Sequence, residues 1–180
     1  MWPTAEEIIA DLASGDADRV REGLEAITLR HDVEEPVELA PVGAEALAAL
    51  GPDLDEETQL ELMRLWAEYP AWRPAMSAAD RAWQTALLAI CYGNTRVALE
   101  ASLLAKGAED PAAATRDLLV RLSARGVAAS EVPGATALVS YLLAGAVPVR
   151  AATVAALSGF DGELSRVRDG VAGELEDGER

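Results

Sequence analysis

Hydrophobic residues recur along this chain every three or four positions, in short segments separated by glycine, proline or polar residues. This spacing places apolar side chains on one face of a helix. In the segment after Ala17, for example, Val20, Leu24 and Ile27 share one face, and charged residues occupy the other. The pattern predicts amphipathic helices along most of the chain.

Capping residues mark the helix boundaries. Thr4 and Glu7 have the spacing of a capping box, and glycines follow several segments, as at helix C-termini. About ten short helices are predicted. They start or are capped at Thr4, Asp16 or Asp18, Pro41, Asp55, Ser77, Asn94, Pro111, Pro133, Pro148 and Asp161. Their ends are predicted before Gly15 and His31, at Leu50, Tyr69, Tyr92, Gly107, Gly126, Ala144 and Leu157, and in an acidic tail.

The composition supports an all-α fold. About half of the residues are hydrophobic, and most of these are Ala and Leu, which favour helices. No segment alternates the β-branched and aromatic residues that strands prefer. The segment 132–149 is uncharged, but Pro133, Gly134, Gly145 and Pro148 interrupt it, so we expect a buried central helix rather than a membrane span.

The predicted helices are regularly spaced. First helices of successive pairs start near Thr4, Pro41 and Ala78, 37 residues apart, and second helices start near Ala17, Glu56 and Thr95, 39 residues apart. A helix-pair period near 40 is typical of α-solenoids. The spacing predicts antiparallel helix pairs stacked in a right-handed α-solenoid, with an irregular helical bundle as the alternative.

Two segments, 18–27 and 149–157, resemble the second helix of a HEAT repeat. In each, a Val-Arg pair opens the helix and small residues follow. The resemblance implies that the arginine reaches the neighbouring inter-helix turn. After residue 107 two registers remain open. Either the helix from Pro133 pairs with that from Val149 and the helix from Pro111 is an insert, or Pro111 pairs with Pro133 and Val149 opens a new first helix.

Residues 1–173 are predicted to form a single repeat domain, and 174–180 a frayed acidic tail. The N-terminus has neither the basic nor the apolar region of a secretory signal, so we expect a cytoplasmic protein. Arg outnumbers Lys by 14 to 1, which indicates a high-GC bacterial source.

Charge is distributed unevenly. Residues 1–69 carry a net charge of −14, residues 70–160 carry +2 and the last twenty carry −4. Nucleic-acid binding requires a basic surface, so we expect no nucleic-acid partner. We also expect no membrane partner, because the longest uncharged segment is interrupted by proline and glycine. An acidic surface suits a basic protein. The candidate partner-binding residues are the acidic ones together with a Trp-Arg pair in a proline-flanked turn: Glu22, Glu25, Asp55, Glu57, Glu61, Glu68, Trp72 and Arg73.

Catalytic motifs are missing from the sequence. One histidine, His31, and one cysteine, Cys91, are too few for a zinc site or a nucleophile–histidine pair, so we expect no cofactor, no metal and no catalytic residue. Cys91 lies in an apolar run and is expected in the core. The resulting hypothesis is that the chain is a protein-interaction module. More specifically, the hypothesis is an inhibitor or an immunity-type protein that binds a basic protein partner. The alternative is a small enzyme or ligand-binding helical protein that uses carboxylates.

Overall fold

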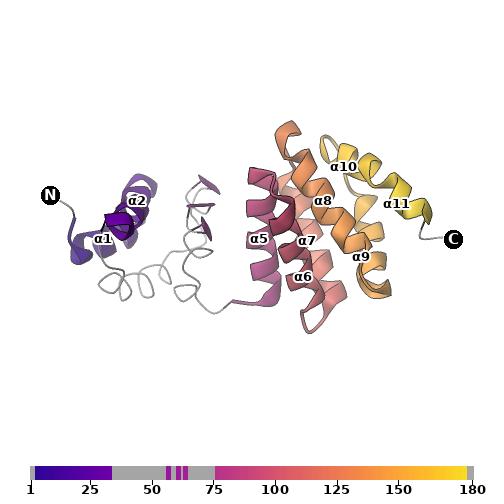
Figure 1. Cartoon of the computed structure of the whole chain (residues 1–180), viewed down its shortest axis with the longest axis horizontal. Coiled ribbons are helices and arrows are strands. Elements are labelled where there is room, and N and C mark those ends of the chain that lie inside the picture. Colours follow the sequence, from indigo (N-terminus) through magenta and orange to yellow (C-terminus); the bar gives the residue numbers. More distant parts are fainter. Residues whose placement is uncertain (1–2, 34–55, 58–59, 62, 65–75, 178–180) are drawn as a thin grey trace. The chain divides into compact units, whose positions relative to one another are not determined.

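The computed structural model describes residues 3–33, 56–57, 60–61, 63–64 and 76–177 (Figure 1). Every regular element in these residues is a helix, and no strand occurs among them, which confirms the all-α prediction. The chain divides into two compact units, residues 1–75 and residues 76–180. The prediction of a single domain over residues 1–173 stays a prediction.

The first unit begins with α1 (Ala5–Leu12) and α2 (Ala17–Val33). The predicted capping box is present, because the Glu7 backbone N–H donates to Thr4 Oγ1 and the Thr4 N–H donates to Glu7 Oε2. Asp16, rather than Asp18, caps α2: its Oδ1 accepts from the N–H groups of residues 18 and 19 at 3.0 and 3.1 Å. α2 continues to Val33, so its predicted end before His31 is too early.

The apolar faces of α1 and α2 pack on each other. Their side chains at the predicted helical spacing are at most 3% exposed: Ile8, Leu12, Val20, Leu24 and Ile27. The predicted helix 41–50 lies outside the described residues. Of the predicted helix after Asp55, the described parts 56–57, 60–61 and 63–64 are helical.

The second unit contains most of the described helices. They are α5 (Ala78–Tyr92), α6 (Thr95–Lys106), α7 (Pro111–Arg125), the 3-10 helix η3 (Ala129–Glu131), α8 (Val132–Leu143), α9 (Val147–Leu157), α10 (Leu164–Gly170) and α11 (Ala172–Asp177). Ser77 and Asn94 cap α5 and α6 as predicted, and Pro111 lies in the first turn of α7. The last predicted helix is divided into α10 and α11.

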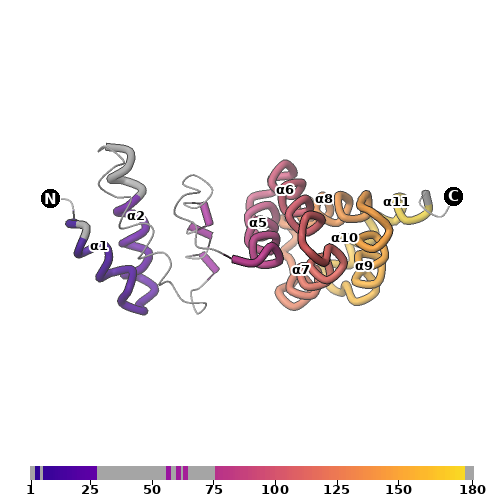
Figure 2. The backbone as a smooth tube through the Cα atoms, turned by 90° about the horizontal axis from the view of Figure 1, so that it is seen from below, coloured from indigo at the N-terminus to yellow at the C-terminus, as the bar shows by residue number. Residues whose placement is uncertain are grey.

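Helices of the second unit pack on the helix two places further along the chain. α5 contacts α7, and α7 contacts α9; α6 contacts α8, and α8 contacts α10. Figure 2 shows α7 and α9 on one side of this unit and α6 and α8 on the other. α5 and α6 form the most extensive contact between two helices and are joined through Gly93, whose φ of 62° ends α5 in the left-handed region.

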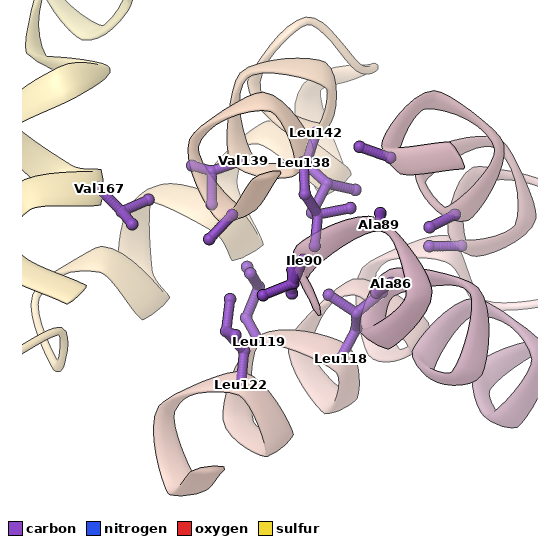
Figure 3. Close-up of a cluster of buried hydrophobic side chains, with 14 of the residues drawn as sticks. Ala86, Ala89, Ile90, Leu118, Leu119, Leu122, Leu138, Val139, Leu142 and Val167 are labelled. Atoms are coloured by element: carbon purple, nitrogen blue, oxygen red, sulfur yellow. The ribbon is translucent and has the colours of Figure 1, made fainter. Parts of the chain in front are cut away.

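The core of the second unit surrounds α8, which packs on α5, α6, α9, α10 and α11 (Figure 3). Leu138, Val139 and Leu142 of α8 are fully buried, as the sequence predicts for a central helix. The facing residues of α5 and α6 are mostly alanine, and the partly buried Trp83 packs against this core. No helix among the described residues is both long enough and apolar enough to cross a bilayer.

Gly134 marks the closest approach in this core. A Cβ at this position would lie 2.6 Å from the Ala89 carbonyl oxygen and 2.9 Å from the Ile90 Cα, both backbone atoms of α5. A backbone cannot move aside as a flexible side chain can. Gly134 therefore lets α8 lie directly on α5.

Gly134→Ala is expected to lower the free energy of unfolding by about 2–3 kcal/mol, because α8 must move away from α5 and the surrounding side chains lose contacts. Gly173→Ala is the control, since a Cβ there meets nothing within 4 Å. It should leave stability unchanged or raise it by up to about 1 kcal/mol. Urea unfolding followed by circular dichroism measures both, and equal stability of the two variants would contradict the close-approach argument.

Candidate functional site

The predicted acidic residues of α2 lie on its exposed face. Burial of Val20, Leu24 and Ile27 against α1 turns Glu22 and Glu25 to the solvent, one helical turn apart. Neither carboxylate forms an ion pair with another described residue. Glu57 is likewise exposed, and Glu61 pairs with Arg64 at 3.0 Å. The other predicted partner-binding residues, Asp55, Glu68, Trp72 and Arg73, lie outside the described residues.

Three arginines of the first unit, Arg19, Arg21 and Arg64, pair with carboxylates close to them in sequence. Arg19 contacts Asp11 of α1 at 2.6 Å, and Arg21 lies 3.5 Å from Asp18. These pairs, like that of Arg64, are mostly exposed, so each contributes little stability. They nevertheless leave Glu22, Glu25 and Glu57 without a counter-ion in the described part of the unit. The result is a surface with uncompensated negative charge.

The second unit carries a groove where three helices begin. The first residues of α5, α7 and α9 line it, together with the end of α6. Its volume is about 1290 Å³ and it is open to solvent. The lining residues are mostly small and apolar: Ala78, Ala79, Ala108, Pro111, Ala112, Ala113, Ala114, Ala146, Pro148 and Val149, with Ser77, Lys106, Glu109, Asp110 and Asp117 as the polar ones.

Lys106 is the only lysine of the chain and the only base that lines the groove. Its Nζ donates a hydrogen bond to the Tyr141 carbonyl oxygen near the C-terminus of α8. Partial burial lowers the pKa of Lys106, because desolvation disfavours the charged form. The ammonium is therefore directed at a helix C-terminus, where positive charge is favourable.

Three carboxylates, those of Glu109, Asp110 and Asp117, also line the groove. Glu109 is exposed, and Asp110 caps α7 by accepting from the Ala113 N–H at 2.9 Å. Arg121 lies between two acids: its Nε is 2.9 Å from Asp117 Oδ2, and its Nη2 is 3.0 Å from Asp80 Oδ1. The lining thus has three carboxylates and one ammonium, and Arg121 is shared by two acids.

A second polar cluster joins α7 to the start of α8. Arg125 donates to both carboxylate oxygens of Glu131 at 2.9 Å, and these side chains are only 18% and 14% exposed. The Arg125 guanidinium holds the pKa of Glu131 at about 2. Cys91 Sγ lies 3.4 Å from Arg125 Nη2 and is only partly buried, so the sequence-based expectation of a core cysteine is wrong. The thiol at the end of α5 therefore contacts this polar pair.

Glu131→Gln tests whether this ion pair stabilises the fold. A pKa lowered from about 4.5 to about 2 means that the stabilisation is present above pH 4.5 and is lost as the pH falls toward 2. The free energy of unfolding of the variant should therefore be about 2–3 kcal/mol lower than that of the wild type at pH 7. Near pH 3 this difference should be smaller.

Glu163→Gln is the matched control, because Glu163 forms an exposed ion pair with Arg166 at 2.9 Å. It should change stability by less than about 0.5 kcal/mol at either pH. Denaturant unfolding at pH 7 and pH 3 gives the change in the free energy of unfolding for each of the two variants at each pH. A Glu131→Gln effect that is equal at both pH values would contradict the assigned ion pair.

Among the described residues, no group of three or more His, Cys, Asp or Glu side chains is placed to hold a metal ion. The predicted acids of α2 are confirmed as exposed, whereas the groove and the Arg125–Glu131 pair were not predicted. Ser77, Pro111 and Pro148 mark the starts of the helices that line the groove, but nothing in the sequence indicates that these starts lie together.

In comparisons with protein-family models, curated proteins and solved structures, the chain matches none of them.

Proposed function

We propose that this chain is a protein-interaction module that binds a basic protein through the acidic surface of its first 69 residues. The observation that carries the proposal is the exposure of Glu22, Glu25 and Glu57 without ion pairs to described residues, while Arg19, Arg21 and Arg64 are already paired. Such a surface attracts a positively charged partner from solution and repels acidic ones.

The proposed architecture is a HEAT-like α-solenoid. The contacts of α5 with α7, α7 with α9, α6 with α8 and α8 with α10 are those that two stacked rows of helices require. Both registers after residue 107 remain open: α8 packs on α9, as pairing of Pro133 with Val149 requires, and α7 packs on α9, as the register with Val149 at the start of a new first helix requires. Arg150 donates to the Leu143 carbonyl at the end of α8, beside the turn between α8 and α9, as the resemblance implies, and to the Glu174 carbonyl of α11.

A solenoid of this kind offers an extended surface rather than an enclosed active site. The net charge of −16 disfavours nucleic acid, whose phosphates carry the same sign. The concrete form of the proposal is an inhibitor or immunity-type protein that neutralises a basic partner in the cytoplasm. A single cysteine, which cannot form an internal disulfide, fits that compartment.

The triple variant Glu22→Lys, Glu25→Lys and Glu57→Lys is expected to lose the partner. Wild-type protein on beads should capture a basic protein from a native-host extract at low salt. The variant should bind that purified protein at least roughly tenfold more weakly, because three attractive carboxylates become repulsive. Mass spectrometry identifies the captured protein, and isothermal titration calorimetry gives the affinities.

A charge-matched control separates the docking surface from the net charge of the whole chain. Asp161→Lys, Glu163→Lys and Glu176→Lys reverse three exposed acids of the second unit and change the net charge equally. This control should bind the partner with an affinity within about threefold of the wild type. If the two triple variants bind equally well, the acidic surface of the first unit is not the docking surface.

A further inference from the structure

We infer that the groove of the second unit binds a segment of the basic partner in which a lysine or arginine lies next to an apolar side chain. The inference rests on the proposed function, since it supplies a second contact for the same partner. It concerns the surface formed by the starts of α5, α7 and α9 and the end of α6, which is distinct from the acidic residues of α2.

Small side chains shape this groove. Its lining consists mainly of alanine methyl groups and proline rings, so backbones and methyl groups form the floor and no large side chain fills the space. Beside it, Val147 is 80% exposed in the first turn of α9. Apolar surface of this kind is more stable when covered than when hydrated. An occupant therefore needs an apolar side chain or a long aliphatic stem.

The charges of the groove determine the sign of the occupant. Glu109 is exposed and forms no ion pair with a described residue, and Asp110 and Asp117 add two further carboxylates. The single ammonium, that of Lys106, is directed at the Tyr141 carbonyl oxygen. Arg121 contacts Asp117 but also neutralises Asp80. Asp110 caps the positive N-terminus of α7, so Glu109 is the lining carboxylate that no described group compensates.

Lysine and arginine match both properties of the groove. Their methylene stems cover apolar surface while their charged heads reach carboxylates. On this surface, the stem would lie on the alanine floor of α7 and the head would approach Glu109. A neighbouring leucine or valine of the partner would cover the remaining apolar lining. An acidic segment would place like charges together and is disfavoured.

The test uses the full chain and a fluorescein-labelled peptide of about fourteen residues made of Leu and Lys, with leucines at helical spacing. A second peptide has Glu in place of Lys. Fluorescence anisotropy measures binding of each. The Leu-Lys peptide should bind with a Kd below about 1 mM, and the Leu-Glu peptide should bind at least tenfold more weakly.

Two variants probe the groove, each with a matched control. Ala113→Trp fills the groove from an exposed position of α7, and Ala124→Trp adds the same bulk at an exposed position in the last turn of that helix, outside the groove. Glu109→Lys reverses a lining charge, and Asp161→Lys reverses an exposed charge beyond the C-terminal end of α9. The groove variants should weaken Leu-Lys binding about fivefold or more, and the controls less than about twofold.

Each other outcome overturns the inference. Equal binding by Ala113→Trp and Ala124→Trp would exclude the groove. The proposed function would still stand if the Glu22, Glu25 and Glu57 reversals weakened partner binding. Preferential binding of the Leu-Glu peptide would show that the groove binds an acidic segment rather than a basic one. Self-association of the chain that Ala113→Trp abolishes would make the occupant a second copy. Absence of Leu-Lys binding up to about 1 mM would also reject the proposed occupant.

Discussion

The close contact between α8 and α5 at Gly134 is the constraint on which the second unit depends. Because a hydrogen replaces a side chain there, the α8 backbone meets the Ala89 and Ile90 backbone directly. Alanines on α5 and α6 continue this close packing, so Leu138, Val139 and Leu142 of α8 reach a common core. Small residues thus substitute for the large aromatic side chains that the chain largely lacks.

Close packing also accounts for the groove. α5, α7 and α9 lie in successive contact, and their first turns lie close enough together to line one depression. The residues at these starts are alanines and prolines, which favour helix initiation and leave the depression unfilled. The same residue types that allow a tight core therefore leave open the surface on which a ligand segment can lie.

The helix starts could be predicted from sequence because capping is local chemistry. Thr4 with Glu7, Ser77 and Asn94 act within three residues of their own position, and each was placed correctly. The Arg125–Glu131 pair, the Cys91 contact and the groove could not be predicted in this way. They depend on how separate helices pack, and no local periodicity contains that information.

Electrostatics connects the fold with the proposed function. The first unit pairs its described arginines locally and exposes further carboxylates, and the groove of the second unit has the same sign of charge. A basic partner would therefore meet attractive surfaces on both units, whatever their relative placement. Attraction of this kind weakens as salt screens it.

The most direct measurement is the affinity of the captured partner for the full chain as a function of salt concentration. The account predicts that log Kd rises steadily with log salt, and that the triple reversal of Glu22, Glu25 and Glu57 makes this dependence markedly flatter. An affinity that does not change with salt, or identical slopes for the wild type and the variant, would contradict the account.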